Sequence, residues 1–337
     1  MSKGKVASLI DELSGELGDS VNTAMEVKHW LNTGFSPLNA IISGDYDGGM
    51  PGGRIVEMFG PPSCGKTAIS TNVMASAISV GGFALYEDHE RSFDIDLARN
   101  LGLDDSTGRF AHTKPKTLEE SFTRSMKVAR RIREEKMIPA DAPIVAVFDS
   151  LAAMVPKSKV EKELGELSMH DSLALAKATS TVLPVVAKFA EEYDILVIML
   201  NQLRENPGVT YGDNSRTPGG KAPGYYASVR IKLSASQLVD KNDGEKTRLG
   251  QQITAEIIKN KVARPFLKTK WNFLYTEEGS GKFDVTGGLI DHLKGEGKIE
   301  TSGNYLLWDG KKYYRQGLID LINEKGLVPE LEKLCRA

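Results

Sequence analysis

Gly60 to Thr67 read GPPSCGKT, which fits the phosphate-binding pattern G-x-x-x-x-G-K-[ST]. The glycines at the two fixed positions let the backbone turn tightly and approach a polyphosphate, because no Cβ stands in the way. Successive backbone amides then point inward as an anion-binding nest. Lys66 is placed to reach the β- and γ-phosphates of a nucleotide, and the hydroxyl of Thr67 is placed to bind Mg²⁺. The stretch therefore predicts a nucleotide-binding loop around which the fold is organised.

The flanking segments predict the strand and the helix that such a loop connects. Residues 54–59 (RIVEMF) form a short apolar run, and residues 68–80 (AISTNVMASAISV) have a helical composition. The N-terminus of that helix would face the anion. A glycine-rich turn that merely ends a strand is the alternative, but it does not account for strand, loop and helix together. The predicted nucleotide-binding residues are Gly60, Pro61, Pro62, Ser63, Cys64, Gly65, Lys66, Thr67 and Ala68.

The composition is that of a globular protein with a substantial core. The length of 337 residues predicts one large domain with additions, or two domains, and 40% of the residues are hydrophobic. With a net charge of −2, the chain as a whole is not basic, so a nucleic-acid site would have to be a local cluster of basic residues. Cys64 and Cys335 are the only cysteines, too few for a disulfide framework and typical of a reducing compartment. Without a signal-like N-terminus or a run of membrane-spanning length, we expect a cytoplasmic protein with no membrane partner.

Two predicted strands after the loop end in acidic residues. Residues 82–87 (GFALYE) run into Asp88, His89 and Glu90, and residues 144–148 (IVAVF) run into Asp149. Such strand ends open onto the active-site edge of a parallel sheet. Glu90 or Asp88 could polarise an attacking water, although these residues taken alone are better explained as ordinary acids of a loop. Asp149 fits the Walker B pattern, an acid that holds Mg²⁺ at the tip of a buried strand.

A long loop follows the next predicted strand. Residues 195–200 (ILVIML) end in Asn201 and Gln202, and the Gln202 amide is suited to sensing a γ-phosphate. Residues 203–224 are rich in Gly, Pro, Asn and Ser, and a loop of this length is usually functional or disordered. The charges of Arg204, Arg216 and Lys221 suit contacts with phosphate. Gly219 and Gly220 leave the backbone free to approach a ligand.

The ends of the chain predict additional units. The apolar spacing at 5–17 predicts an amphipathic helix, which would pack either on its own domain or on a neighbouring subunit. A charged helix is expected at 118–136, and strands are expected at 227–235, 252–259 and 270–275. Lys259 and Lys261 stand at the end of a strand, where solubility alone would explain them. Residues 283–337 are expected to form a small separate domain.

Taken together, these segments resemble the RecA-type homologous recombinases over nearly the full length. The matching segments are MPGGRIVEMFGPPSCGKT (50–67), LYEDHERSFDIDLARNLG (85–102), VFDSLAAMVPK (147–157), NQLRENPGV (201–209), TPGGKAPGYYASVRIKL (217–233), IIKNKVARPFLKTKWNFLY (257–275) and GGLIDHLKGEGKIETSGNYLLWDGKKYYRQG (287–317). The stretch GDYDGGMPGG at 44–53 is more similar to phage recombinases of the UvsX kind. We therefore expect a phage-encoded protein.

The resemblance implies a role for each matching residue of the nucleotide site. Glu90 would activate the hydrolytic water, and Gln202 would couple the γ-phosphate to the loop that follows it. Lys259 and Lys261 would reach the ATP of a neighbouring subunit and stabilise transferred charge, as arginine fingers do. Asp94 would contact adenine. Leu97 stands where the family carries an aromatic residue that stacks on the base, which leaves base selectivity open.

The same resemblance implies two DNA-binding loops, at 156–171 and 203–220, and makes the N-terminal helix an arm that docks on the next subunit. The first loop aligns poorly, so its contacts transfer less directly. Residues after the second loop, Gly224 and Tyr225, also depart from the family. The implied DNA-binding residues are Met169, Lys177, Arg204, Asn206, Arg216, Gly219, Gly220 and Lys221.

We therefore predict an α/β fold with a RecA-type P-loop core and a twisted, mostly parallel sheet. The predicted units are an N-terminal oligomerisation arm (1–33), an ATPase core (34–279) and a small α+β C-terminal domain (280–337). The predicted function is ATP- and Mg²⁺-dependent strand exchange by a helical filament on single-stranded DNA. Expected partners are single-stranded DNA, double-stranded DNA, other copies of the chain, a single-strand-binding protein and a loader.

Three other functions remain open. A hexameric RecA-fold helicase would form closed rings and would usually carry an arginine finger where this chain offers lysines. A recombination mediator would bind ATP without hydrolysis, which the intact Lys66, Thr67, Glu90 and Asp149 argue against. A small-molecule P-loop kinase would have no use for the long loop after Gln202.

Overall fold

The computed structural model describes residues 26–162, 173–205, 215–240, 247–276 and 281–337. Three predictions lie outside the described residues: the N-terminal helix at 5–17, Met169 and Asn206.

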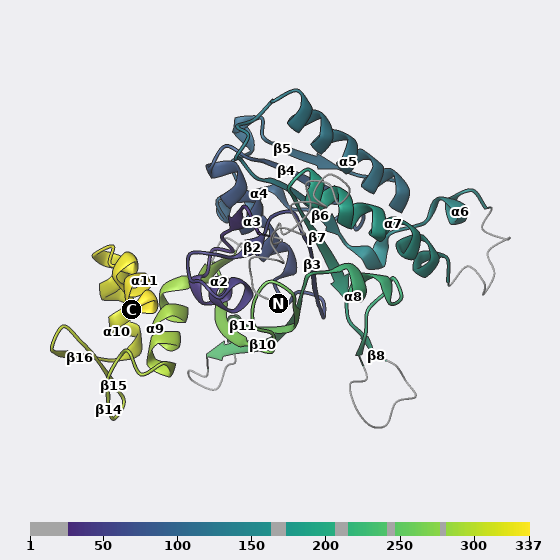
Figure 1. Cartoon of the computed structure of the whole chain (residues 1–337). Coiled ribbons are helices and arrows are strands. Elements are labelled where there is room, and N and C mark those ends of the chain that lie inside the picture. Colours follow the sequence, from purple (N-terminus) through teal and green to yellow (C-terminus); the bar gives the residue numbers. More distant parts are fainter. Residues whose placement is uncertain (1–25, 163–172, 206–214, 241–246, 277–280) are drawn as a thin grey trace, which may run out of the picture.

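A sheet of nine strands forms the centre of the molecule, in the order β13-β12-β11-β10-β3-β7-β6-β4-β5 (Figure 1). Its strands are β3 (Ile55–Gly60), β4 (Phe83–Asp88), β5 (Phe110–Thr113), β6 (Ile144–Asp149), β7 (Ile195–Gln202), β10 (Val229–Asp240), β11 (Thr247–Asn260), β12 (Lys268–Tyr275) and β13 (Gly281–Asp284). All neighbours from β10 to β5 pair in parallel, whereas β10, β11, β12 and β13 pair antiparallel. The predicted α/β fold with a mostly parallel core is confirmed.

Helices cover both faces of the sheet because the central strands are apolar on both sides. Alternate residues of β3 and β7 enter two different cores: Ile55 and Met199 lie in one, and Val56 and Ile198 lie in the other. Continuous apolar runs are typical of parallel strands that are buried on both faces. The helices of the core are α2 (Ser36–Ser43), α3 (Lys66–Ser79), α4 (Ile95–Asn100), α5 (Leu118–Glu134) and α7 (Ala174–Glu192).

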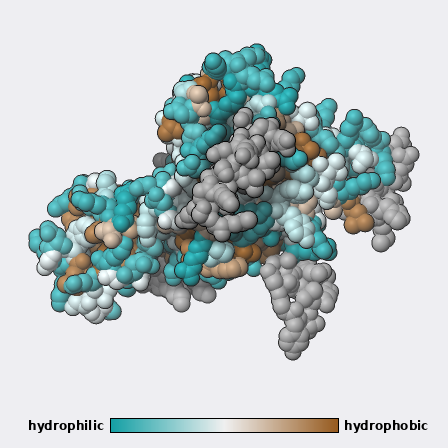
Figure 2. All heavy atoms as spheres, viewed as in Figure 1, coloured by the Kyte–Doolittle hydropathy of each residue, from teal (hydrophilic) through white to brown (hydrophobic). Residues whose placement is uncertain are grey.

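Helix α5 is the charged helix that the sequence predicts, but one of its faces is apolar. Phe122, Ala129 and Ile132 are buried in the core beneath it. The ring of Phe122 stacks on that of Phe148 from β6, with centroids 4.3 Å apart. The helix is therefore an amphipathic layer over the sheet. The coloured surface in Figure 2 is mostly hydrophilic, with hydrophobic residues in small separate patches.

Short elements flank the central sheet. β1 (Trp30–Leu31) pairs with β2 (Met50–Pro51), and β8 (Arg204–Glu205) pairs with β9 (Ser215–Arg216). The segment after β9 contains α8 (Ala222–Tyr226), so the predicted long loop at 203–224 is partly regular. Single turns occur at α6 (Lys157–Val160), η1 (Asp105–Thr107) and η2 (Leu151–Ala153).

The C-terminal elements follow β13 directly and lie at one end of the molecule in Figure 1. They are α9 (Val285–Gly295), β14 (Thr301–Ser302), β15 (Tyr305–Trp308), β16 (Lys311–Tyr313), α10 (Arg315–Glu324) and α11 (Val328–Arg336). Gly288 of α9 lies so close to Phe35 and Trp271 that an added Cβ would approach both side chains to within 3.0 Å. Among the helices in the described part of the chain, none is long and apolar enough to cross a membrane.

Candidate nucleotide site and adjoining loops

The phosphate-binding motif forms the connection between β3 and α3, and its two fixed glycines are required sterically. A Cβ on Gly60 would lie 2.3 Å from the carbonyl oxygen of Leu233, and a Cβ on Gly65 would lie 2.6 Å from Ile253. Gly65 also has a φ of +89°, in the left-handed region. It precedes α3 without offering a side-chain cap. The first amides of α3 therefore remain available to an anion.

Lys66 folds back over the loop that precedes it. Its ammonium donates hydrogen bonds to the carbonyl oxygens of Gly60 at 3.2 Å and Pro61 at 2.8 Å. The oxygens of a nucleotide phosphate could replace these two carbonyl oxygens as partners of the ammonium. The thiol of Cys64 is buried below, and burial raises its pKa. The Cys64 side chain thus fills space beneath the loop, and its predicted contact with nucleotide stays a prediction.

Thr67 and Asp149 form the oxygen-rich side of the site. The Thr67 hydroxyl donates to Asp149 Oδ2 at 3.1 Å. The hydroxyl of Tyr86, a fully buried residue on β4, donates to the same carboxylate oxygen. Burial is the main reason that the pKa of Asp149 is raised, to about 6.

This donor set fits the predicted Mg²⁺. Mg²⁺ is usually bound through one or two protein oxygens together with substrate phosphates and water. The described residues contain no cluster of three or more carboxylate, imidazole or thiolate groups, so an all-protein metal cage is absent from them. The hydroxyl of Thr67 and the carboxylate of Asp149 would hold the ion beside the phosphates, where it would neutralise charge on the β- and γ-oxygens.

Glu90 lies at the meeting point of three strand ends. Ser150, which follows β6, donates its hydroxyl hydrogen bond to Glu90 Oε1. Gln202 Nε2, at the tip of β7, donates to the same oxygen at 3.1 Å. The backbone amide of Glu90 itself bonds the carbonyl oxygen of Asp149 at 3.1 Å. The residues predicted to activate water, serve the metal and sense phosphate are therefore brought together.

Asp88 has a different role from Glu90. Its carboxylate accepts hydrogen bonds from the amides of Arg91, Ser92 and Phe93 at 2.7, 3.3 and 3.3 Å. His112 Nε2 lies 3.2 Å from it. With Asp88 only 1% exposed, this carboxylate organises the turn after β4, whereas Glu90 is exposed to solvent.

Asp94 is placed by helix capping. One of its carboxylate oxygens accepts hydrogen bonds from the amides of Asp96 and Leu97, both at 3.0 Å, and so caps the start of α4. Leu97 packs against the main core. These contacts account for Asp94 structurally, so its predicted contact with adenine stays a prediction.

The two predicted DNA loops approach one another at a shared cavity of about 600 Å³. One side comprises Pro156, Lys159 and Leu173, and the other comprises Arg204 and Arg216. The two arginines also face each other across the β8–β9 pair. Lys177 lies on the exposed side of α7 and lines a neighbouring cavity with Lys162.

Gly219 and Gly220 use their conformational freedom for packing. Their φ angles are +93° and +70°, and an added Cβ would lie 2.9 Å from Leu151 in the first case and 2.9 Å from Ala176 in the second. The hydroxyl of Thr179 on α7 donates to the carbonyl oxygen of Gly219 at 2.7 Å. The two glycines therefore allow the end of the second loop to pack closely against α7. A DNA contact for either glycine stays a prediction.

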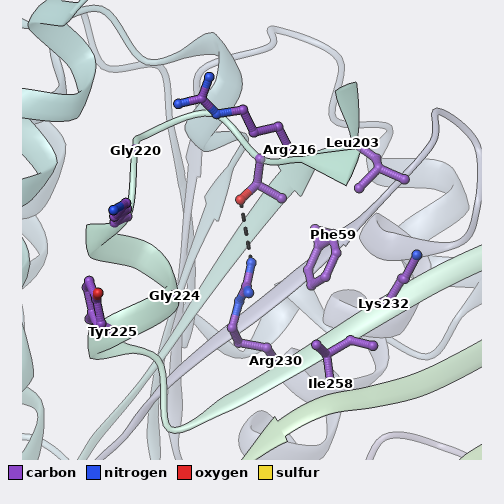
Figure 3. Close-up of a pocket in the computed structure, with 11 residues that line it drawn as sticks. Phe59, Leu203, Arg216, Gly220, Gly224, Tyr225, Arg230, Lys232 and Ile258 are labelled. Atoms are coloured by element: carbon purple, nitrogen blue, oxygen red, sulfur yellow. Dashed lines mark hydrogen bonds between the residues drawn. The ribbon is translucent and has the colours of Figure 1, made fainter. Parts of the chain in front are cut away.

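A second cavity, of about 400 Å³, lies beside residues 215–220 of the second loop (Figure 3). This segment, which leads back from the loop to the core, is called the returning limb below. Its lining includes Phe59 at the end of β3 and four cationic residues, Arg216, Lys221, Arg230 and Lys232. Basic side chains of this kind suit a phosphate backbone.

Lys259 and Lys261 stand far from the phosphate loop of their own chain. Gln251 on β11 donates to the carbonyl oxygen of Ser63 at 2.6 Å, which places it at the loop. Lys259 follows eight residues later on the same strand, roughly 26 Å away at about 3.3 Å per residue. Its ammonium bonds the carbonyl oxygens of Gly224 and Tyr225 at 2.7 and 2.9 Å. Burial, followed by the charges of Lys261 and Arg230, lowers its pKa to about 8.

Sequence reasoning missed three buried polar residues that support this site: Tyr86, Gln251 and Glu57. Each lies inside a strand, and its role depends on a partner more than 60 positions away. A carboxylate within the otherwise apolar run of β3 was the one available signal, because buried charges need partners.

Comparison with known proteins gives close relatives. The family described as RecA N-terminal domain matches residues 12–280. Protein RecA of Paenarthrobacter aurescens (strain TC1) is 32% identical over 324 residues, which cover 95% of this chain and 85% of that protein. Protein RecA of Kineococcus radiotolerans is 34% identical over 294 residues, which cover 87% of this chain and 77% of that protein. A solved RadB recombinase aligns with a TM-score of 0.48 at 20% identity, over 74% of this chain and 97% of that one.

Proposed function

The chain belongs to the RecA family, and from that premise we propose that it is an ATP-dependent recombinase. It assembles as a helical filament on single-stranded DNA and catalyses homologous pairing and strand exchange with double-stranded DNA. ATP and Mg²⁺ are its cofactors, and DNA stimulates its ATPase activity. We place it in the cytoplasm. A single-strand-binding protein, a loader and a phage origin stay predictions.

The observation that supports this proposal best is the link from the nucleotide site to the second loop. Gln202 contacts the carboxylate of Glu90 on one side. On the other side, the chain continues through Leu203 directly into β8 and the second loop. A γ-phosphate that rearranges Gln202 can therefore bias the loop proposed to hold DNA, because both lie on one short segment.

The chain's own residues account for the steps of hydrolysis. Lys66 and the amides at the start of α3 bind the phosphates. Glu90, held by Ser150 and Gln202, orients a water and accepts its proton. Charge in the transition state is stabilised by Lys259 and Lys261 of the adjacent copy, since neither lysine is near its own loop. The proposed units remain the arm at 1–33, the core at 34–279 and the C-terminal domain at 280–337.

DNA is held through its backbone, at Arg204, Arg216, Lys221, Lys177, Met169, Asn206 and the two glycines of the second loop. Bases are then free to pair with a duplex, so base pairing reads the sequence. Binding that depends on phosphate contacts weakens steeply with salt, because condensed counterions are released.

The test is electron microscopy of the protein with single-stranded DNA and a slowly hydrolysed ATP analogue. Helical filaments that shorten or vanish when residues 1–18 are deleted support both the recombinase and the arm. Closed rings would instead support a hexameric helicase. A strand-exchange assay on the same samples separates a recombinase from a mediator, which would bind ATP without turnover.

A further inference from the structure

Glu57 is a buried carboxylate that the proposed chemistry does not use. It lies in the middle of β3, three residues before the phosphate loop, and its side chain is fully buried. Its two strand neighbours are Met199 of β7 and Arg230 of β10. Ionised groups are rarely this buried unless specific donors hold them, and here both carboxylate oxygens have such donors.

On the side of β7, the donor is Asn201. Its Nδ2 donates to Glu57 Oε1 at 2.9 Å and to the carbonyl oxygen of Pro218 at 3.0 Å. Its Oδ1 accepts the backbone amide of Gln202 at 2.9 Å. Asn201 therefore joins Glu57, the phosphate-sensing residue and the returning limb of the second loop.

On the side of β10, the donor is Arg230. Its Nε donates to Glu57 Oε2 at 2.6 Å, and its Nη2 lies 3.5 Å from the Thr217 hydroxyl, which also belongs to the returning limb. The guanidinium carbon lies 4.7 Å from the centre of the Phe59 ring, which holds the group over the end of β3. Figure 3 shows Arg230 beside Phe59, with a dashed line from its guanidinium to the segment that carries Arg216; this is the bond to Thr217.

We propose that Glu57 is a positioning residue that couples the nucleotide site to the second DNA loop. Through Asn201 and Arg230 it holds two consecutive loop residues, Thr217 and Pro218, in register with Gln202. A shift of Gln202 on nucleotide binding is then passed to the loop, because Glu57 and Asn201 are fully buried and hydrogen bonds join Gln202, Asn201, Glu57 and Arg230 in one network. This assignment rests on the proposed function, since it needs a second loop that binds DNA.

Glu57→Gln tests the assignment. Glutamine keeps the shape of the side chain, but its NH₂ group would face either Asn201 Nδ2 or Arg230 Nε, which are both donors. One of these two hydrogen bonds is therefore lost. The quantity measured is the gain in affinity for single-stranded DNA on adding a slowly hydrolysed ATP analogue. We expect this gain to fall about tenfold, while the dissociation constant of the analogue changes less than about threefold. Glu256→Gln is the control, because Glu256 pairs with Lys268 at 3.0 Å elsewhere in the same sheet.

The outcomes separate this assignment from the proposed function. A folded Glu57→Gln protein that keeps the full gain overturns the assignment alone. A wild-type protein without any nucleotide-linked gain overturns the proposed function and the assignment with it. If Glu57→Gln does not fold, Arg230→Lys decides, because a lysine keeps a positive charge beside Glu57 but loses the bond to Thr217. A reduced gain in Arg230→Lys supports the coupling, and an unchanged gain overturns it.

Discussion

Gln202 Nε2 lies 3.1 Å from Glu90 Oε1, although 112 positions separate the two residues. The contact joins the tips of β7 and β4 across β6, whose own tip supplies Asp149 and Ser150. A carboxylate held by an amide and a hydroxyl keeps one orientation, which is what a residue that positions an attacking water requires. The contact also means that a change at Glu90 reaches the residue that precedes the second loop.

Replacing Glu90 by glutamine is expected to abolish hydrolysis while nucleotide binding persists. The amide retains the shape of the side chain but cannot accept a proton, so turnover should fall at least about 100-fold. Single-turnover ATP hydrolysis and equilibrium binding of a fluorescent ATP analogue measure the two effects. Glu135→Gln, at the exposed end of α5, is the matched control. Unchanged turnover in Glu90→Gln would show that another group is the base.

Tyr86→Phe is expected to raise the Mg²⁺ concentration needed for nucleotide binding by about tenfold. The phenol donates a hydrogen bond to Asp149, and losing a bond to a charged group costs about 1.5–3 kcal/mol. The measurement is a Mg²⁺ titration of fluorescent-nucleotide binding. Tyr46→Phe is the control, because it removes a hydroxyl that lies 2.9 Å from His292 in another part of the protein. A midpoint that moves equally in both variants, or in neither, contradicts the role of Tyr86.

Lys259 is expected to become reactive at lower pH than an ordinary lysine. Its lowered pKa of about 8 means that half of its side chains are neutral and nucleophilic at that pH. The ordinary lysine pKa of 10.5 applies once the chain is unfolded. The folded state therefore binds fewer protons between these two values, and Lys259 makes stability rise with pH across that window. Acylation rates measured by peptide mapping against pH, in native and urea-denatured protein, check the difference. Equal midpoints for Lys259 in the two states contradict it.

Phe122→Ala is expected to lower the free energy of unfolding by about 3–5 kcal/mol. The ring is 1% exposed and stacks on Phe148, so the truncation leaves a cavity between α5 and the sheet. Phe266→Ala is the control, since Phe266 is 72% exposed and should change stability by less than about 0.5 kcal/mol. Urea denaturation followed by circular dichroism provides both values. Similar losses in the two variants would mean that the α5 layer contributes little.

Several features follow from the sequence alone because they depend on neighbouring residues. The phosphate loop is eight consecutive residues, and its glycines, lysine and threonine have local reasons for their positions. The strands that carry Asp149 and Gln202 are continuous apolar runs, which predict their burial and their polar tips. The matched segments also identify the family. The division into arm, core and C-terminal domain was likewise drawn from the sequence, and it stays a prediction.

Other features were decided only by the tertiary structure, because they depend on strand order and register. The pattern of residues allowed either Asp88 or Glu90 to polarise a water, and only the family resemblance implied Glu90. In the structure, the turn after β4 directs the Asp88 carboxylate to backbone amides and that of Glu90 to Gln202. Gly219 and Gly220 pack on α7, a contact that composition does not reveal. Tyr86, Gln251 and Glu57 gain their roles from distant partners. Local periodicity sets which residues are buried, but only the pairing of strands decides which buried polar groups meet.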